Sequence, residues 1–214
     1  MSFNFKSYTE IVNFIEKNNT KQVKIVAVSK NHPLSTIENA LSFGVRIFGE
    51  NRVQEAIQKF KPLKEKFIDL ELHLTGPLQS NKVKLALSIF DVFQTLDREK
   101  LAREFLKFPD LIHKKQFFIQ VNIGTESNKS GILPEEATDF INYCRNDLKL
   151  NISGLMCIPP QQEDPKPYFL LLKRLAQQNS IACLSMGMSA DYKIGILCGT
   201  THIRVGTCLF GERK

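Results

Sequence analysis

Residues 23–50, VKIVAVSKNHPLSTIENALSFGVRIFGE, decide the fold class of this 214-residue chain. The apolar, β-branched run over 23–30 predicts a buried strand, and the run over 46–50 predicts a second one. Between them, Pro33 followed by Glu38 is typical of the first turn of a helix. Parallel strands need a helical crossover, so this strand–helix–strand order favours a parallel sheet.

The same kind of segment recurs to the end of the chain. Helices are predicted over 98–107, 133–144 and 166–178, where apolar residues recur with helical spacing, and another over about 7–18 precedes the first strand. The eight runs predicted as strands are 23–30, 46–50, 71–76, 91–96, 116–123, 152–158, 181–186 and 202–209.

Eight βα units predict a single (β/α)8 barrel of the TIM type, with residues 1–214 forming one domain. An open, doubly wound sheet is the alternative fold. The dinucleotide fingerprint of that fold, G-x-G-x-x-G, is absent from the sequence, and so is the phosphate-binding loop G-x-x-x-x-G-K-[ST]. We therefore expect the barrel.

The composition is that of an ordinary globular domain. Hydrophobic residues make up 43% and charged residues 24% of the chain, which excludes a collagen, a disordered chain or a disulfide scaffold. Lys and Arg number 29 against 22 Asp and Glu, a net charge of +7, which mildly favours an anionic partner. Without a secretory signal or an apolar run near the roughly 18 residues of a membrane span, a cytoplasmic protein is expected.

The cysteines and histidines point to no metal centre. The cysteine count is odd and no C-x-x-C pair occurs, so buried thiols in a reducing compartment are expected. His73 is interpreted as a structural histidine, and Asp97-Arg98 as a cap of the following helix. The residues that lack a metal-like spacing are Cys144, Cys157, Cys183, Cys198 and Cys208, with His32, His73, His113 and His202.

Lys30 is the most informative candidate for a functional residue. Ligands of parallel barrels bind at the carboxyl ends of the strands, and Lys30 ends the first predicted strand. Desolvation there would lower the pKa of its amine, and a neutral amine forms an imine with an aldehyde. A solvated lysine beyond the strand end is the alternative, and position alone favours it.

The last two units add a predicted phosphate site. The loops after strands 7 and 8 commonly bind phosphate in such barrels, and here they hold the small residues of 185–189 and 204–207. Gly187 and Gly206 allow the backbone to approach a ligand, and a helix start near 189–191 would aim N–H groups at an anion. Ordinary turn chemistry is the alternative. Together with Lys30, the pattern indicates a phosphorylated aldehyde, of which pyridoxal 5′-phosphate (PLP) is the common cofactor.

Seven collinear motifs carry a resemblance to a known family. With them the chain resembles the pyridoxal phosphate homeostasis protein family over nearly its whole length. The motifs are AVSK (27–30), FGENRVQE (48–55), LHLTGPLQSNK (72–82), QVNI (120–123) through KSG (129–131), GLMCIP (154–159), LSMGMS (184–189), and RVGT (204–207) through FGER (210–213).

The resemblance implies a fold-type III PLP barrel, similar to the barrel domain of alanine racemases. Lys30 would hold PLP as an internal aldimine, Arg204 would face the pyridine nitrogen, and Asn51 would border the ring. Lys129 matches a family lysine near the site. The residues implied to hold the phosphate are Ser185, Gly206 and Thr207, joined by Ser189. The chain departs from the family at Ala190 (commonly Gly), Asn31 (commonly Thr) and Thr75 (commonly Ile).

The function implied is intracellular PLP homeostasis, in which the protein buffers or delivers PLP without established catalysis. Its implied partners are PLP and PLP-dependent apoenzymes, with the chain as a monomer or weak homodimer. An amino-acid racemase is the alternative, but such enzymes add a β-domain and a tyrosine base. Only 210–214 follow the last unit, and Tyr192, the one tyrosine placed to approach the site, is interpreted as a packing residue.

A nucleic-acid binder is the third hypothesis, prompted by the positive charge. The basic residues are scattered, and no recognised nucleic-acid motif occurs. We therefore expect neither a nucleic-acid nor a membrane partner. The run of basic residues interpreted as a solvated helix face is Lys59, Lys61, Lys64 and Lys66.

Overall fold

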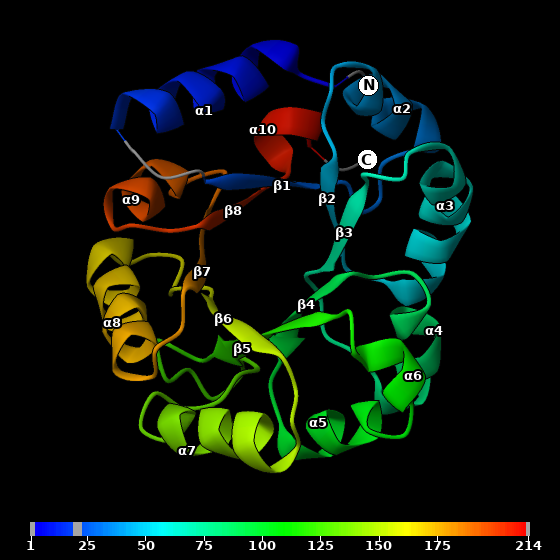
Figure 1. Ribbon diagram of the computed structural model, residues 1–214. Coiled ribbons are helices and arrows are strands. Elements are labelled where there is room, and N and C mark those ends of the chain that lie inside the picture. Colours follow the sequence, from blue (N-terminus) through cyan, green and yellow to red (C-terminus); the bar gives the residue numbers. More distant parts are fainter. Residues whose placement is uncertain (1–2, 19–22, 213–214) are drawn as a thin grey trace.

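The computed structural model describes residues 3–18 and 23–212. Its strands close into a parallel barrel in chain order, with β8 returning to β1. Figure 1 shows the ring of strands with the helices outside it. The predicted barrel is therefore confirmed, and the open sheet is excluded. The strands are β1 Lys24–Val28, β2 Ile47–Glu50, β3 Glu71–Leu74, β4 Val92–Leu96, β5 Gln116–Val121, β6 Ile152–Cys157, β7 Cys183–Met188 and β8 His202–Val205.

Helices follow the strands around the outside of the barrel. The first helix precedes β1 and lies against α9 and α10. The helices are α1 Phe5–Asn18, α2 Leu34–Ser42, α3 Val53–Lys66, α4 Val83–Leu87 behind a 3₁₀ turn at Ser80–Lys82, α5 Glu99–Phe105, α6 Pro109–Ile112, α7 Ala137–Asn142 with a π turn at Tyr143–Asp147, α8 Pro165–Gln178, α9 Tyr192–Leu197 and α10 Thr207–Phe210.

The predictions made just after β4 and at the end of β8 differ from the structure. The eighth strand ends at Val205, because the Gly206 carbonyl accepts hydrogen bonds from the N–H groups of Leu209 and Phe210 and turns the chain into α10. The prediction that Asp97-Arg98 caps the next helix is wrong. No side chain caps α5, and Asp97 pairs with Arg98, whose guanidinium also donates to the Leu78 carbonyl.

Aromatic packing fills the layer between the sheet and the helices, and a second, smaller apolar cluster lies among polar side chains inside the barrel. In the outer layer the Phe93 and Phe117 rings stack with centroids 5.3 Å apart. The inner cluster contains Val92, Phe118 and Met156, all buried. The barrel interior is thus a packed core rather than a pore, as barrels of this size require.

Gly154 is a sensitive point of the inner core. A Cβ added there would lie 2.7 Å from three atoms of the Phe118 ring. We expect Gly154→Ala to lower the free energy of unfolding by about 1–3 kcal/mol, because the packed interior cannot take the methyl group without shifting the ring. Urea unfolding measures the loss. Adding Phe118→Leu to Gly154→Ala should recover part of the lost stability. A urea midpoint for Gly154→Ala equal to that of the wild type would contradict this packing.

Burial also makes the barrel sensitive to acid through His202. Burial is the main cause that lowers the pKa of this imidazole to about 3, whereas an unfolded histidine titrates near pH 6.5. Between these values the unfolded chain binds more protons, so the free energy of unfolding falls as pH falls through this window. We expect His202→Gln to remove about 2 kcal/mol of that loss between pH 6.5 and 5. The exposed His113→Gln serves as the control, and equal pH slopes for all three proteins would refute the prediction.

Cys144, Cys157 and Cys198 are buried, as expected, whereas Cys183 and Cys208 are half-buried. All five cysteines are free, and burial raises the pKa of Cys144 and Cys157 to about 12. Within 3–18 and 23–212, no set of three or more His, Cys, Asp or Glu side chains is grouped to hold a metal ion. None of the helices described is both long and apolar enough to cross a membrane.

Candidate functional site

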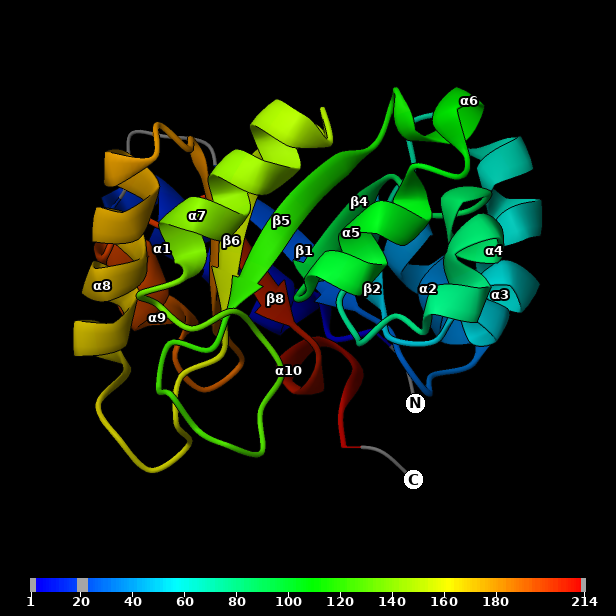
Figure 2. The ribbon, with the colours of Figure 1, turned by 90° about the horizontal axis from the view of Figure 1, so that it is seen from below.

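The carboxyl ends of the strands share one end of the barrel with α10 and the loops after β5 and β6, as Figure 2 shows. A cavity of about 330 Å³ opens there. Six of the seven residues predicted to bind a cofactor line this cavity, and Ser185 does not. The six are Lys30, Asn51, Ser189, Arg204, Gly206 and Thr207.

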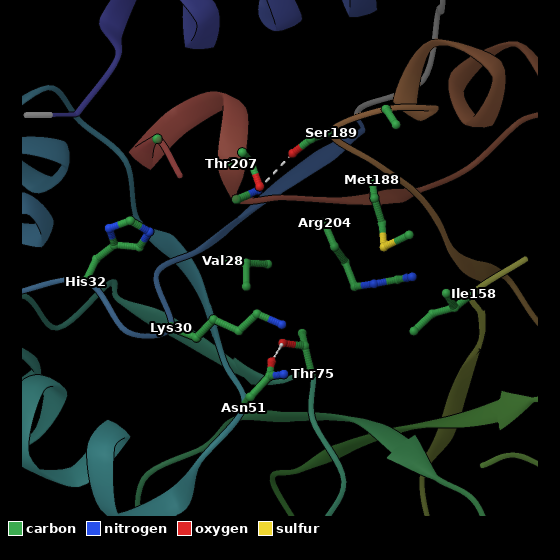
Figure 3. A pocket seen from close by; sticks show the side chains of 13 residues that line it. Val28, Lys30, His32, Asn51, Thr75, Ile158, Met188, Ser189, Arg204 and Thr207 are labelled. Carbon is green, nitrogen blue, oxygen red and sulfur yellow. Dashed lines mark hydrogen bonds between the residues drawn. The ribbon is translucent and has the colours of Figure 1, made fainter. Parts of the chain in front are cut away.

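Lys30 is carried by a loop that α3 holds in place. The Lys59 ammonium donates to the carbonyl oxygens of Ser29 (3.0 Å) and His32 (3.4 Å), on either side of Lys30. Between them, Asn31 adopts a φ of 63° and donates its N–H to Glu55 (2.6 Å). This loop directs the Lys30 side chain into the cavity (Figure 3).

The interpretation of Lys59 as a solvated residue is wrong. Its ammonium lies 2.6 Å from the fully buried Glu50 and 2.9 Å from Glu55. Burial raises the pKa of Glu50, while Lys59 and the Ser29 hydroxyl act in the opposite direction. Lys59 lies on the buried face of α3 with Ala56 and Leu63, and the helical spacing of these apolar residues could have distinguished it from Lys61.

Arg204 forms a fixed cationic wall of the cavity. It is only 5% exposed, and its guanidinium donates to the carbonyl and hydroxyl oxygens of Ser185, both at 2.7 Å, and to the Cys157 carbonyl at 2.8 Å. Burial lowers the pKa of Arg204, yet a guanidinium remains charged in proteins. Ser185 therefore lies beneath the guanidinium and positions it.

The loops after β7 and β8 meet at a group of N–H donors. The Ser189 hydroxyl accepts from the backbone N–H groups of Gly206 (3.3 Å) and Cys208 (3.5 Å) at the start of α10. Figure 3 draws the bond at Ser189 to the first of these groups. A Cβ at Gly206 would come 3.1 Å from the Val28 carbonyl oxygen, a tight contact that glycine avoids. The helix start expected at 189–191 lies slightly later, with α9 beginning at Tyr192.

The remaining walls are apolar or fixed by hydrogen bonds. Thr75 donates its hydroxyl to the Asn51 side-chain oxygen at 3.0 Å, which orients that amide at the cavity edge (Figure 3). Val28, Ile158 and Met188 supply the apolar surface. The cavity can therefore hold a flat, partly apolar ring between cationic groups and N–H donors.

Two further residues named from the sequence lie outside this cavity. Lys129 lines a neighbouring cavity of about 310 Å³ and pairs with Glu126. Tyr192 packs its ring against Phe14, with centroids 6.2 Å apart. The structure thus places Tyr192 in packing, as the sequence interpretation expected.

Comparisons with known proteins agree with this geometry. The family described as alanine racemase, N-terminal domain, matches residues 10–214. The pyridoxal phosphate homeostasis protein of Haemophilus influenzae is 41% identical over 210 residues, covering 93% of this chain and 89% of that protein. PipY of Synechococcus elongatus, solved with PLP bound, superposes with a TM-score of 0.81 at 33% identity, covering 94% and 99% of the two chains.

A more distant structure shares only the fold. Alanine racemase from Corynebacterium glutamicum superposes with a TM-score of 0.73 at 14% identity. The match covers 99% of this chain but 62% of the racemase.

Proposed function

This chain belongs to the family of pyridoxal phosphate homeostasis proteins, and from that premise we propose that it binds PLP at the carboxyl end of its barrel and stores or delivers it. One observation carries the proposal. The Lys30 amine, the Arg204 guanidinium and the N–H donors around Ser189 line the same cavity. PLP is a phosphorylated aldehyde with an aromatic ring, and each of these groups suits a different part of it.

The residues present fit the cofactor in size and chemistry. The cavity of about 330 Å³ falls within the roughly 300–1,000 Å³ of ligand pockets. Ser189, Gly206 and Thr207 line the cavity, and their hydroxyl and N–H groups are the kind of donor that a phosphate accepts. When bound, PLP supplies an aldehyde that condenses with a primary amine with loss of water.

We propose that each of these residues interacts with a different part of PLP. Lys30 offers the amine, and Asn51, oriented by Thr75, borders the ring. Gly206, Thr207 and Ser189 line the cavity and would hold the phosphate. Ser185 positions Arg204 instead of binding the phosphate. Arg204 would face the ring nitrogen, where a fixed cation would disfavour protonation of that nitrogen.

These assignments favour storage over turnover. A ring nitrogen kept unprotonated makes the cofactor a weaker electron sink, which is the property that amino-acid chemistry on PLP requires. Among the described residues that line the cavity there is no tyrosine, so the base of a racemase has no counterpart in this lining. PLP-dependent apoenzymes are then the proposed recipients, and residues 1–214 are proposed to act as one unit.

Uptake and exchange measurements test the proposal together. The full chain should bind about one equivalent of PLP, with a visible absorbance band, and should bind pyridoxal, which lacks the phosphate, more weakly. Loaded protein incubated with L-alanine in D₂O should exchange the Cα proton no faster than free PLP does. No stoichiometric uptake would overturn the binding proposal, and exchange at enzyme-like turnover would overturn storage in favour of a racemase-like enzyme.

A further inference from the structure

A row of polar side chains crosses the barrel interior from the cavity to the opposite end. We call this row the polar relay. It contains Arg204, Ser185, Gln94, His73 and Glu71. Its hydrogen bonds join Arg204 Nη1 to Ser185 Oγ (2.7 Å), Ser185 Oγ to Gln94 Oε1 (2.6 Å), Gln94 Nε2 to His73 Nδ1 (2.7 Å), and His73 Nε2 to Glu71 Oε1 (2.7 Å).

Along the relay each residue donates a hydrogen bond to the next one, from Arg204 toward Glu71. Gln94 Nε2 is a donor, so His73 Nδ1 accepts and the proton of the neutral ring lies on Nε2, which donates to Glu71. The Ser185 hydroxyl donates to Gln94 and accepts from Arg204. The relay therefore links a cation at the cavity to a carboxylate at the other end through aligned dipoles, which strengthen one another in a low dielectric.

The relay bears on how the buried charge of Arg204 is balanced, to which the carboxylate of Asp191 also contributes. A buried charge is costly unless it is compensated. The hydrogen-bond acceptors that Arg204 contacts, two oxygens of Ser185 and the Cys157 carbonyl, are all neutral. The three residues between Arg204 and Glu71 are wholly buried, so little water lies between them along the relay.

Glu71 is suited to be the distant anion. Its hydrogen bond from His73 is the largest cause that holds the pKa of Glu71 down at about 2. Lys24, at the start of β1, also pairs with Glu71 at 3.0 Å, but its side chain is 42% exposed and so is partly screened by water. Burial lowers the pKa of His73, so the ring between the two charges stays neutral.

We propose that Glu71 is the remote counter-ion of Arg204, acting through the polar relay, and that it is a positioning residue for the cation of the cavity. Its effect on a bound cofactor rests on the proposed function. Its effect on Arg204 does not, because the relay consists of this chain's own residues.

A double-mutant cycle on the cofactor-free full chain tests the coupling. Glu71→Gln and Arg204→Gln are combined, and the unfolding equilibrium constants are measured in urea. Independent sites add to within about twofold. We expect the double variant to depart from additivity by about fivefold or more, because Glu71→Gln costs less once the cation is gone. Additive effects would overturn the proposal.

Two further variants keep the cycle decisive. Asp69→Asn breaks the Arg46–Asp69 ion pair (3.0 Å), two residues before β3 and outside the relay, and it should add independently to Arg204→Gln. Should Arg204→Gln fail to fold, Gln94→Leu replaces it, because that change interrupts the relay midway. Equal behaviour of Asp69→Asn and Glu71→Gln would refute a specific link.

The loaded protein gives a second readout. Neutralising Glu71 leaves the guanidinium less balanced, so a protonated group beside it is disfavoured. We expect the apparent pKa read from the visible absorbance of bound PLP to fall by about half a pH unit or more in Glu71→Gln and to stay constant in Asp69→Asn. The titratable and charged groups around the relay are Lys24, Glu71, His73, Asp91, Cys157, Cys183, Asp191, His202 and Arg204.

The two readouts separate the two proposals. A wild-type protein that takes up no PLP defeats the proposed function, while the cofactor-free cycle still decides the relay. A coupled cycle with an unshifted titration would overturn the influence of Glu71 on the cofactor. A coupled cycle with the expected shift supports both.

Discussion

Lys30→Ala should abolish covalent retention of PLP. After borohydride reduction and denaturation, we expect the variant to keep at least about tenfold less cofactor than the wild type, because no other primary amine lines the described cavity. Fluorescence of the reduced adduct on the denatured chain measures the retained fraction. The loop that carries Lys30 is held by Lys59 and Glu55 through backbone contacts, so truncation of the side chain leaves its support intact.

Two further variants test whether the primary amine of Lys30, and not its charge or any nearby lysine, retains PLP. Lys30→Arg keeps the positive charge but cannot condense with the aldehyde at neutral pH, so it should lose retention as completely as alanine does. Lys82→Ala removes a lysine from an adjoining cavity and should retain PLP like the wild type. Full retention in Lys30→Ala would show that the anchor lies elsewhere.

Arg204→Gln should change both the stability of the fold and the titration of bound PLP. Loss of the guanidinium deprives three buried acceptor oxygens of their donor, and we expect the free energy of unfolding to fall by about 2–4 kcal/mol. Removing a cation makes protonation next to it easier, so the apparent pKa of the bound cofactor should rise by about one unit or more. Urea unfolding and a visible-absorbance titration measure the two effects.

Arg98→Gln provides the matched control for Arg204. Arg98 pairs with Asp97 and donates to the Leu78 carbonyl in a neighbouring cavity. Its replacement should leave the cofactor titration at the wild-type value. A titration that is identical in Arg204→Gln and the wild type would remove Arg204 from contact with the ring.

The fold could be predicted from the sequence because each strand coincides with a local apolar or β-branched run. The run over 23–30, for example, contains β1 at Lys24–Val28, and the other seven runs likewise overlap one strand each. The end of β8 could not be predicted, because the strand ends where the Gly206 carbonyl accepts hydrogen bonds from the N–H groups of Leu209 and Phe210. An apolar run cannot distinguish a strand from the short buried helix that continues it.

The site was predictable only in part for a related reason. Lys30 and Arg204 stand at or just beyond strand ends, so the barrel rule brings them together without knowledge of side chains. Ser185 lies one layer deeper, and its contact with Arg204 depends on the register of β7 against β8. The relay needs the closure of four strands that are separated in sequence, and no local pattern encodes that closure.

A peptide map of the reduced protein identifies the lysine that anchors PLP. The full chain is loaded with PLP, reduced with borohydride, digested with trypsin and analysed by mass spectrometry. Modification at Lys30 blocks cleavage after that residue, so we expect a phosphopyridoxyl group on one peptide, residues 25–46. A phosphopyridoxyl group on a different lysine, or on none, would contradict the assignment of Lys30 as the residue that anchors PLP.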